Sequence, residues 1–187
     1  MWLEYEILKN PDVPGYFSVS TSYRSEPNPV PGRHDLIFPM FEFECKGNMD
    51  DLVRIQKDLL RYLGYKCDFY ENDYTAIAEE FGVTELEHEH EEKLYTDKSP
   101  VAFIKNFPEF TSPFWNMKRN TENNTGKKVD VILSGIETFG SAERECDVNI
   151  MKNRFENIMN GEYRKKLIQL FGEERVESEL KEYFELN

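Results

Sequence analysis

The chain of 187 residues is long enough for one ordinary domain and too short for two large ones. Hydrophobic residues make up 39% and aromatic residues 14% of it, which excludes a disordered chain, and no apolar run approaches the roughly 20 residues of a membrane span. The net charge of −13 disfavours a free-standing nucleic-acid binder, since phosphate contacts need basic side chains. Three widely spaced cysteines favour a reduced, cytoplasmic setting over a disulfide framework.

The first predicted elements form a hairpin. Residues 15–22 alternate between apolar and polar side chains, as a strand does, and residues 37–44 alternate again. Between them, residues 26–32 hold three prolines and a glycine, which predicts a rigid exposed loop. One face of the second strand carries Glu42 and Glu44, which is unusual for packing alone and is a first indication of a site.

Helices follow the hairpin. Apolar residues recur at helical spacing from Met49 to Leu63, and Gly64 ends that helix. A second helix is predicted from about 73 to 81, and a third from Thr84, where Thr84 and Glu87 have the spacing of a capping box.

The later part of the chain returns to strands and turns before it becomes helical again. These strands and turns are predicted over 101–104, 120–126, 129–133 and 135–144. The remainder is helical, with breaks near Asn160-Gly161 and Gly172. Antiparallel-compatible strand pairs with blocks of helices indicate an α+β fold, a mostly antiparallel sheet flanked by helices, in one domain over 1–187.

Two groups of side chains are suited to chemistry. In the hairpin, the guanidinium of Arg24 can hold a phosphate, Arg33 and His34 can clamp distal phosphates from the loop, and Phe38 offers a ring for a purine. An ordinary charged hairpin is the alternative.

The second group lies in residues 129–147. Asp130 and Glu137 stand at two ends of a strand and turn, and they can share a Mg²⁺ ion that takes its other ligands from phosphate and water. Gly135 and Gly140 allow a ligand to approach the backbone, and Arg144 presents a guanidinium. The alternative is an acidic turn in solvent.

The other polar features have simpler interpretations. His88 and His90 are two positions apart on a helix, so their side chains diverge and cannot share a metal. The acidic run 85–92 is interpreted as a solvated helix face, and the chain contains no P-loop or dinucleotide-binding fingerprint.

Residues 22–44 closely resemble motif 2 of class II aminoacyl-tRNA synthetases, which consists of an aromatic-Arg-x-Glu segment, a variable loop, Arg-His, and a Phe-containing strand with two glutamates. The resemblance implies that Arg24 is catalytic and contacts the α-phosphate of ATP. It further implies nucleotide-binding roles for the other matching positions, which are Glu26 near the adenine and the acceptor, Arg33 and His34 near the γ-phosphate, and Phe38 under the adenine. The chain departs from the motif at Ile37, where the family has Glu.

Residues 129–147 are similar to the corresponding segment of the aspartyl and asparaginyl enzymes, with Gly-x-Glu, a turn of small residues, and Arg seven positions after the Glu. The resemblance implies that Asp130 and Glu137 bind metal and ATP, and that the catalytic Arg144 contacts the side chain of the amino acid, aspartate or asparagine. Gly140-Ser141-Ala142 replaces the family's Gly-Gly-Ser. The aromatic segment 106–117 matches the family in order.

The resemblance begins at about Gly15 and implies a partial class II catalytic core. Motif 1 would precede this chain and motif 3 would follow it, and we favour a fragment over a degenerate paralogue. It implies ATP-dependent formation of an aminoacyl-adenylate with Mg²⁺, a homodimer of the full-length protein, and tRNA as the acceptor. The alternatives are an asparagine synthetase A-like paralogue that uses ammonia, and a binding module without activity. The central expectation is that Arg24 and Glu137 meet around one nucleotide.

Overall fold

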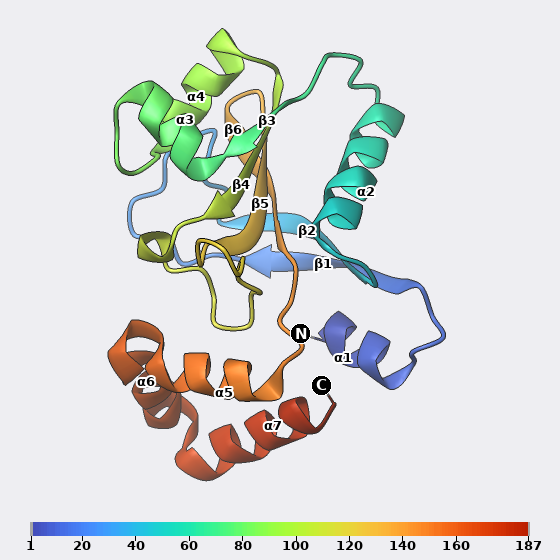
Figure 1. Cartoon of the computed structure of the whole chain (residues 1–187), viewed down its shortest axis with the longest axis vertical. Helices are drawn as coiled ribbons and strands as arrows, with labels where there is room; N and C mark the ends of the chain where they lie inside the picture. The colour runs from blue at the N-terminus through green and yellow to red at the C-terminus, as the bar shows by residue number, and fades with distance from the viewer. Residues whose placement is uncertain (1, 187) are drawn as a thin grey trace. The chain divides into compact units, whose positions relative to one another are not determined.

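The computed structural model describes residues 2–186, and the chain forms two compact units. Unit 1 consists of Met1–Lys46 with Ser178–Asn187, and unit 2 of Gly47–Glu177. Figure 1 labels the elements of both units. The assignment of a single domain over 1–187 stays a prediction.

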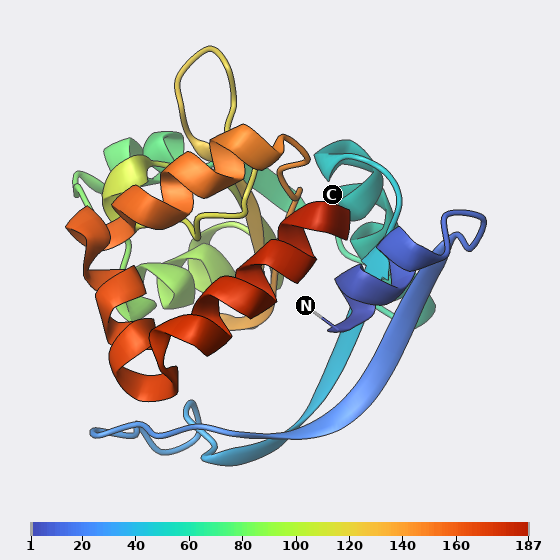
Figure 2. The same cartoon turned by 90° about the horizontal axis from the view of Figure 1, so that it is seen from below.

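Unit 1 is built on the predicted hairpin. Strands β1 (Gly15–Tyr23) and β2 (Ile37–Cys45) pair antiparallel from Gly15↔Cys45 to Tyr23↔Ile37, within one residue of the predicted ends. Figure 2 shows them as a long curved ribbon that ends in the connecting loop. The helix α1 (Trp2–Lys9) was not predicted from the sequence.

Buried polar contacts join the two chain ends in unit 1. Glu4 of α1 is 5% exposed, and it accepts a hydrogen bond of 2.8 Å from the hydroxyl of Tyr183. Tyr183 belongs to the C-terminal part of α7 (Glu173–Leu186). Eight residues are marginal for an isolated helix, so α1 depends on such tertiary contacts rather than on its own propensity.

Unit 2 contains a four-stranded sheet in the order β3-β4-β5-β6. Its strands are β3 (Tyr70–Asp73), β4 (Val101–Phe107), β5 (Gly126–Leu133) and β6 (Ile136–Ala142). The β4–β5 and β5–β6 pairs are antiparallel, which confirms a mostly antiparallel sheet, whereas the unpredicted β3 runs parallel to β4. Strand β4 also extends past the predicted 101–104, because Lys105 and Asn106 interrupt the apolar pattern without ending the strand.

Helices cover both faces of this sheet (Figure 1). Helix α2 (Met49–Tyr62) packs on one face through Met49, Val53 and Leu60, against Val101, Phe103, Val129 and Val131. Helices α3 (Tyr74–Phe81) and α4 (His88–Asp97) pack on the other face, against Ala102, Ile104 and Ile132. Because side chains of a strand alternate between faces, the even-numbered residues of β5, Asp130 among them, share the face of α3 and α4.

The start of α2 is encoded locally. The side chain of Asn48 accepts hydrogen bonds from the backbone N–H groups of Asp50 (2.9 Å) and Asp51 (3.1 Å), and the Asp51 carboxylate accepts one from the N–H of Asn48 (3.2 Å). This reciprocal cap satisfies N–H groups that the helix itself leaves unpaired.

The predicted start of the third helix at Thr84 is wrong. Helix α4 begins at His88, because Glu87 is its N-cap and the backbone N–H of Glu87 donates to Nδ1 of His90 at 2.9 Å. His90 is 5% exposed and its ring lies 5.7 Å from that of Phe81, so the run 85–92 is not wholly a solvated face. His88 is exposed, so the two histidines diverge as predicted.

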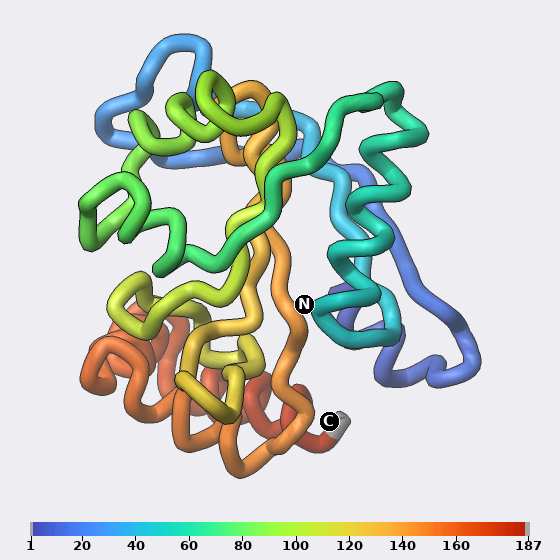
Figure 3. Tube along the Cα trace, turned by 45° about the horizontal axis from the view of Figure 1, so that its top comes forward, coloured from blue at the N-terminus to red at the C-terminus, as the bar shows by residue number. Residues whose placement is uncertain are grey.

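The helical end of unit 2 follows the predicted breaks. Helix α5 (Val148–Asn157) is followed by the short helix η2 (Ile158–Gly161) and by α6 (Glu162–Phe171), the orange part of the tube in Figure 3. Gly172 ends α6 with a φ of 84°. The ring of Trp115 packs edge-on against that of Phe155 with centroids 5.3 Å apart, which ties α5 to the segment after the short helix η1 (Glu109–Thr111). Over the described residues we find no helix with the length and apolar character of a bilayer span.

Candidate active site

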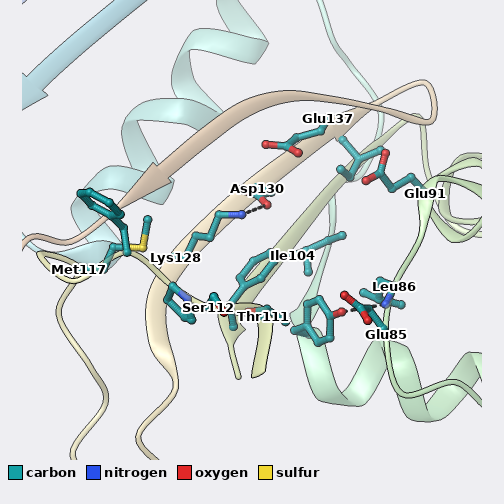
Figure 4. A pocket seen from close by; sticks show the side chains of 15 residues that line it. Glu85, Leu86, Glu91, Ile104, Thr111, Ser112, Met117, Lys128, Asp130 and Glu137 are labelled. Carbon is teal, nitrogen blue, oxygen red and sulfur yellow. Dashed lines mark hydrogen bonds and ion pairs between the residues drawn. The ribbon is translucent and has the colours of Figure 1, made fainter. Parts of the chain in front are cut away.

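Unit 2 contains a cavity of about 430 Å³ on the sheet face that α3 and α4 cover. Figure 4 shows that β5 contributes Lys128 and Asp130 to it and that Glu137 projects from β6. Glu91 comes from α4, and Glu85 from the segment just before that helix. The other lining residues are Tyr74, Leu86, Ile104, Phe107, Thr111, Ser112, Pro113, Phe114, Met117 and Ile132. This volume lies in the range of ligand-binding pockets.

Asp130 has the most strongly shifted pKa among the side chains that line the cavity. The residue is 5% exposed, although a carboxylate is rarely buried without a function or a full set of partners. Its Oδ2 pairs with the ammonium of Lys128 at 2.5 Å, while Oδ1 has no hydrogen-bond partner. Burial and the nearby charge of Glu137 raise the pKa of Asp130 to about 7, and Lys128 opposes the rise.

The missing side chain of Gly140 leaves room beside two carboxylates. Gly140 pairs with Asp130 across the sheet. A β-carbon at this glycine would lie 3.1 Å from Oε1 of Glu137 and 3.6 Å from Oδ1 of Asp130. The two oxygens therefore face the same small space, and the Lys128 ammonium contacts only the other oxygen of Asp130.

This arrangement fits a Mg²⁺ ion that takes most of its ligands from outside the protein. Within residues 2–186 no cluster of three or more acidic, histidine or cysteine side chains could hold a metal by itself. Mg²⁺ commonly uses one or two carboxylates and completes its octahedron with water and phosphate oxygens. The unpartnered Oδ1 of Asp130 and the carboxylate of Glu137 are suitable donors for that kind of site.

Arg144 lies just beyond β6, in a bridge with Met117. Its Nη1 donates to Oδ1 of the buried Asn116 at 3.1 Å, and the arginine does not itself line the cavity, although Met117 does. Ser141, expected in a turn of small residues, lies within β6 and faces the opposite side of the sheet, where its hydroxyl accepts a hydrogen bond of 2.8 Å from Gln56 of α2.

The predicted residues of the hairpin belong to unit 1. The guanidinium carbon of Arg24 lies 5.4 Å from the centre of the Phe38 ring, so the structure brings these two residues together at the base of the loop. The backbone N–H groups of Arg33 and His34 both donate to the carbonyl of Val30, at 3.1 and 2.9 Å. These two hydrogen bonds form the backbone turn that carries Arg33 and His34. Glu26 is half-buried in the same loop.

Sequence reasoning missed several residues of the cavity. Lys128 stands two positions before Asp130, and the two-residue period of a strand puts both side chains on the same face. That signal was present in the sequence, because a lysine on a strand face that packs on helices needs a partner. Glu85 and Glu91 had no such signal, since they were indistinguishable from the other acids around them.

Solved structures resemble this fold. The aspartyl-tRNA synthetase of Entamoeba histolytica aligns with a TM-score of 0.71 at 16% identity, over 98% of this chain and 42% of its own. The asparaginyl-tRNA synthetase of Pyrococcus horikoshii, solved with asparaginyl-adenylate, also gives 0.71 at 16% identity, over 84% of this chain and 44% of its own. At this identity the likeness establishes the fold, which confirms the predicted fold class.

The sequence gives the family. The asparagine–tRNA ligase of Mycoplasma genitalium is 38% identical over 97 residues, which are 50% of this chain and 20% of that protein. The model of the class II tRNA synthetases of the D, K and N type matches residues 6–183. The chain therefore belongs to this family, and it spans less than half the length of each relative named here.

Proposed function

We propose that this chain binds ATP and a small amino acid, aspartate or asparagine, and supports formation of an aminoacyl-adenylate. The observation that carries the proposal is the buried Asp130, whose free oxygen and the carboxylate of Glu137 face one open space beside Gly140. Two carboxylates that share one space repel each other, and a divalent cation bound between them would relieve that repulsion. The chain belongs to a synthetase family, and in the proposed reaction that cation would neutralise the phosphates of ATP.

In the proposed reaction, a carboxylate oxygen of the amino acid attacks the α-phosphorus of ATP. The bond between that phosphorus and the oxygen bridging to the β-phosphate breaks, and pyrophosphate leaves with the electron pair. The attacking carboxylate is already ionised, so no general base is required. Catalysis then consists of positioning and charge neutralisation.

Different residues of the chain would position the substrates and neutralise their charge. Arg24 would hold the α-phosphate, and its contact with Phe38 keeps the guanidinium beside the ring proposed to support the adenine. Arg33, His34 and Glu26 would bind the rest of the nucleotide, and Arg144 the side chain of the amino acid. Asp130 and Glu137 would hold a Mg²⁺, which neutralises phosphate charge when bound. That Arg24 and Glu137 meet at one nucleotide is part of the proposal.

The test is amino-acid-dependent exchange of pyrophosphate into ATP, measured for this chain and for the chain extended by its genomic flanks. With aspartate or asparagine present, we expect exchange that falls about 100-fold or more in Arg24→Ala and in Glu137→Gln. Glu79→Gln is the matched control, because Glu79 is an exposed acid of α3 outside the cavity. Absence of exchange from both proteins would leave a binding module in place of an enzyme.

The acceptor of the adenylate needs a separate assay. The net charge of −13 gives this chain little general attraction for tRNA, so ammonia is the second candidate acceptor. Charging of tRNA and ammonia-dependent formation of asparagine distinguish the two. Exchange activity without tRNA charging, together with asparagine synthesis, would favour the asparagine synthetase A-like alternative.

A further inference from the structure

The cavity already contains a cation of its own. Lys128 lies on β5 two positions before Asp130, and its ammonium contacts Oδ2 of that residue at 2.5 Å. The same ammonium stands 4.1 Å from the centre of the Phe107 ring. Among the described residues that line the cavity, Lys128 carries the one positive charge, against the four acids Glu85, Glu91, Asp130 and Glu137.

The position of this ammonium conflicts with a divalent cation at the same carboxylate. Oδ1 of Asp130 and Oε1 of Glu137 face the space beside Gly140, while Oδ2 of Asp130 is held by Lys128. A cation on Oδ1 would therefore lie one carboxylate's width from the ammonium. The Asp130 side chain is only 7% exposed, so water screens little of the repulsion between the two.

Lys128 also has the means to move. Its side chain is 26% exposed and borders the open cavity. A lysine carries its charge on a flexible stem of four carbons, so the ammonium can leave Asp130 without any change of the backbone.

We propose that Lys128 is an internal competitor for the divalent cation: its ammonium neutralises Asp130 in the metal-free protein and must leave before a metal ion binds Asp130 and Glu137 at full strength. The inference rests on the metal site of the proposed function but not on adenylate formation. It follows that the free protein binds the metal weakly, and that a ligand rich in phosphate, by supplying negative charge, favours binding.

The experiment measures Mn²⁺ binding to the metal-free chain by the electron paramagnetic resonance signal of free Mn²⁺. No nucleotide is present, and each variant is measured at a pH above the pKa of its own Asp130, since removal of Lys128 raises that pKa. We expect Lys128→Met to bind Mn²⁺ at least about tenfold more tightly, because removal of a unit charge a few ångströms away in a poorly screened site favours the metal by that much or more. Lys128→Arg keeps the charge and is expected to bind as weakly as the original chain.

Lys105→Met is the matched control. It removes the same charge from the neighbouring strand β4, but Lys105 pairs with Glu71 at 2.6 Å and does not line the cavity. Its Mn²⁺ affinity is expected to stay within about twofold of the original. Circular dichroism checks folding, and Lys128→Gln serves in place of Lys128→Met should the latter fail to fold.

Equal or weaker Mn²⁺ binding in Lys128→Met would overturn the inference, as would undetectable binding in every variant. Tight binding in Lys128→Arg would also overturn it, since the charge would then be irrelevant. Loss of Mn²⁺ binding in Glu137→Gln locates the ion. Absence of pyrophosphate exchange with an intact effect of Lys128 on Mn²⁺ would refute the proposed function alone.

Discussion

Replacement of Asp130 by asparagine should stabilise the metal-free protein in a pH-dependent way. Burial and the charge of Glu137 together raise the pKa of Asp130 from 3.8 to about 7. The folded protein therefore binds a proton at this site more tightly than the unfolded chain does. The stabilisation that this proton brings is fully present below about pH 4 and is lost as the pH rises to about 7.

The size of the effect follows from the shift. About three pH units correspond to about 4 kcal/mol, which is the most that ionisation of Asp130 costs the folded state above pH 7. The amide that replaces the carboxyl group in Asp130→Asn cannot ionise. The variant should thus match the original chain near pH 4 and exceed its free energy of unfolding by up to about 4 kcal/mol near pH 8.

Urea unfolding from pH 4 to pH 8.5 in the presence of EDTA measures this difference. Trp115, which is 3% exposed in unit 2, reports by its fluorescence once the exposed Trp2 is replaced by Phe. Comparison of two proteins at each pH cancels the titration of carboxylates that do not interact with Asp130. Asp58→Asn, at a carboxylate on α2 that is 63% exposed, should show a difference within about 0.5 kcal/mol at every pH. A gain that does not change with pH, or an Asp130→Asn protein that is less stable at pH 8, would refute the reasoning.

Three further predictions concern unit 2. Asn48→Ala removes the cap of α2 and should lower the free energy of unfolding by about 1 kcal/mol in urea; an unchanged midpoint would contradict the cap. Phe103→Ala, at a fully buried ring, should cost about 3–5 kcal/mol by the same measurement, and a loss below about 1 kcal/mol would mean that the site collapses. Although burial opposes it, hydrogen bonds from Lys118 and Lys127 lower the pKa of Glu143, so its contribution is present above the unfolded-state pKa and is lost as the pH falls. Glu143→Gln should therefore destabilise at pH 7 and have little effect near pH 3, as thermal unfolding at the two pH values can show.

The hairpin was predictable because its causes are local. Alternation over 15–22 and 37–44 gives strands, and the prolines between them exclude a helix. Helix α2 was equally accessible, since its apolar spacing from Met49 and the glycine at position 64 are both local signals. Candidate residues such as Asp130 and Glu137 could be selected for the same reason, because a motif is a local pattern.

The predictions fail where the local structure depends on contacts with residues distant in the sequence. Strand β3 forms only by pairing with β4, 32 positions further along the chain, and α1 is held by the Tyr183 contact from the other end. The start of α4 moved from Thr84 to His88 because Glu87 and the buried His90 make a cap that competes with the expected one.

By itself, the sequence determined the class of fold, the hairpin, helix α2 and the motifs that place the chain among the class II synthetases. The fold class and the motifs depend on the spacing and type of residues, which can be read directly from the sequence. Only the tertiary structure decided that Asp130 is buried, that one of its oxygens has no hydrogen-bond partner, and that Lys128 pairs with the other. Charge and pKa depend on which helices exclude water from a strand, and that becomes defined only when α3 and α4 cover the sheet.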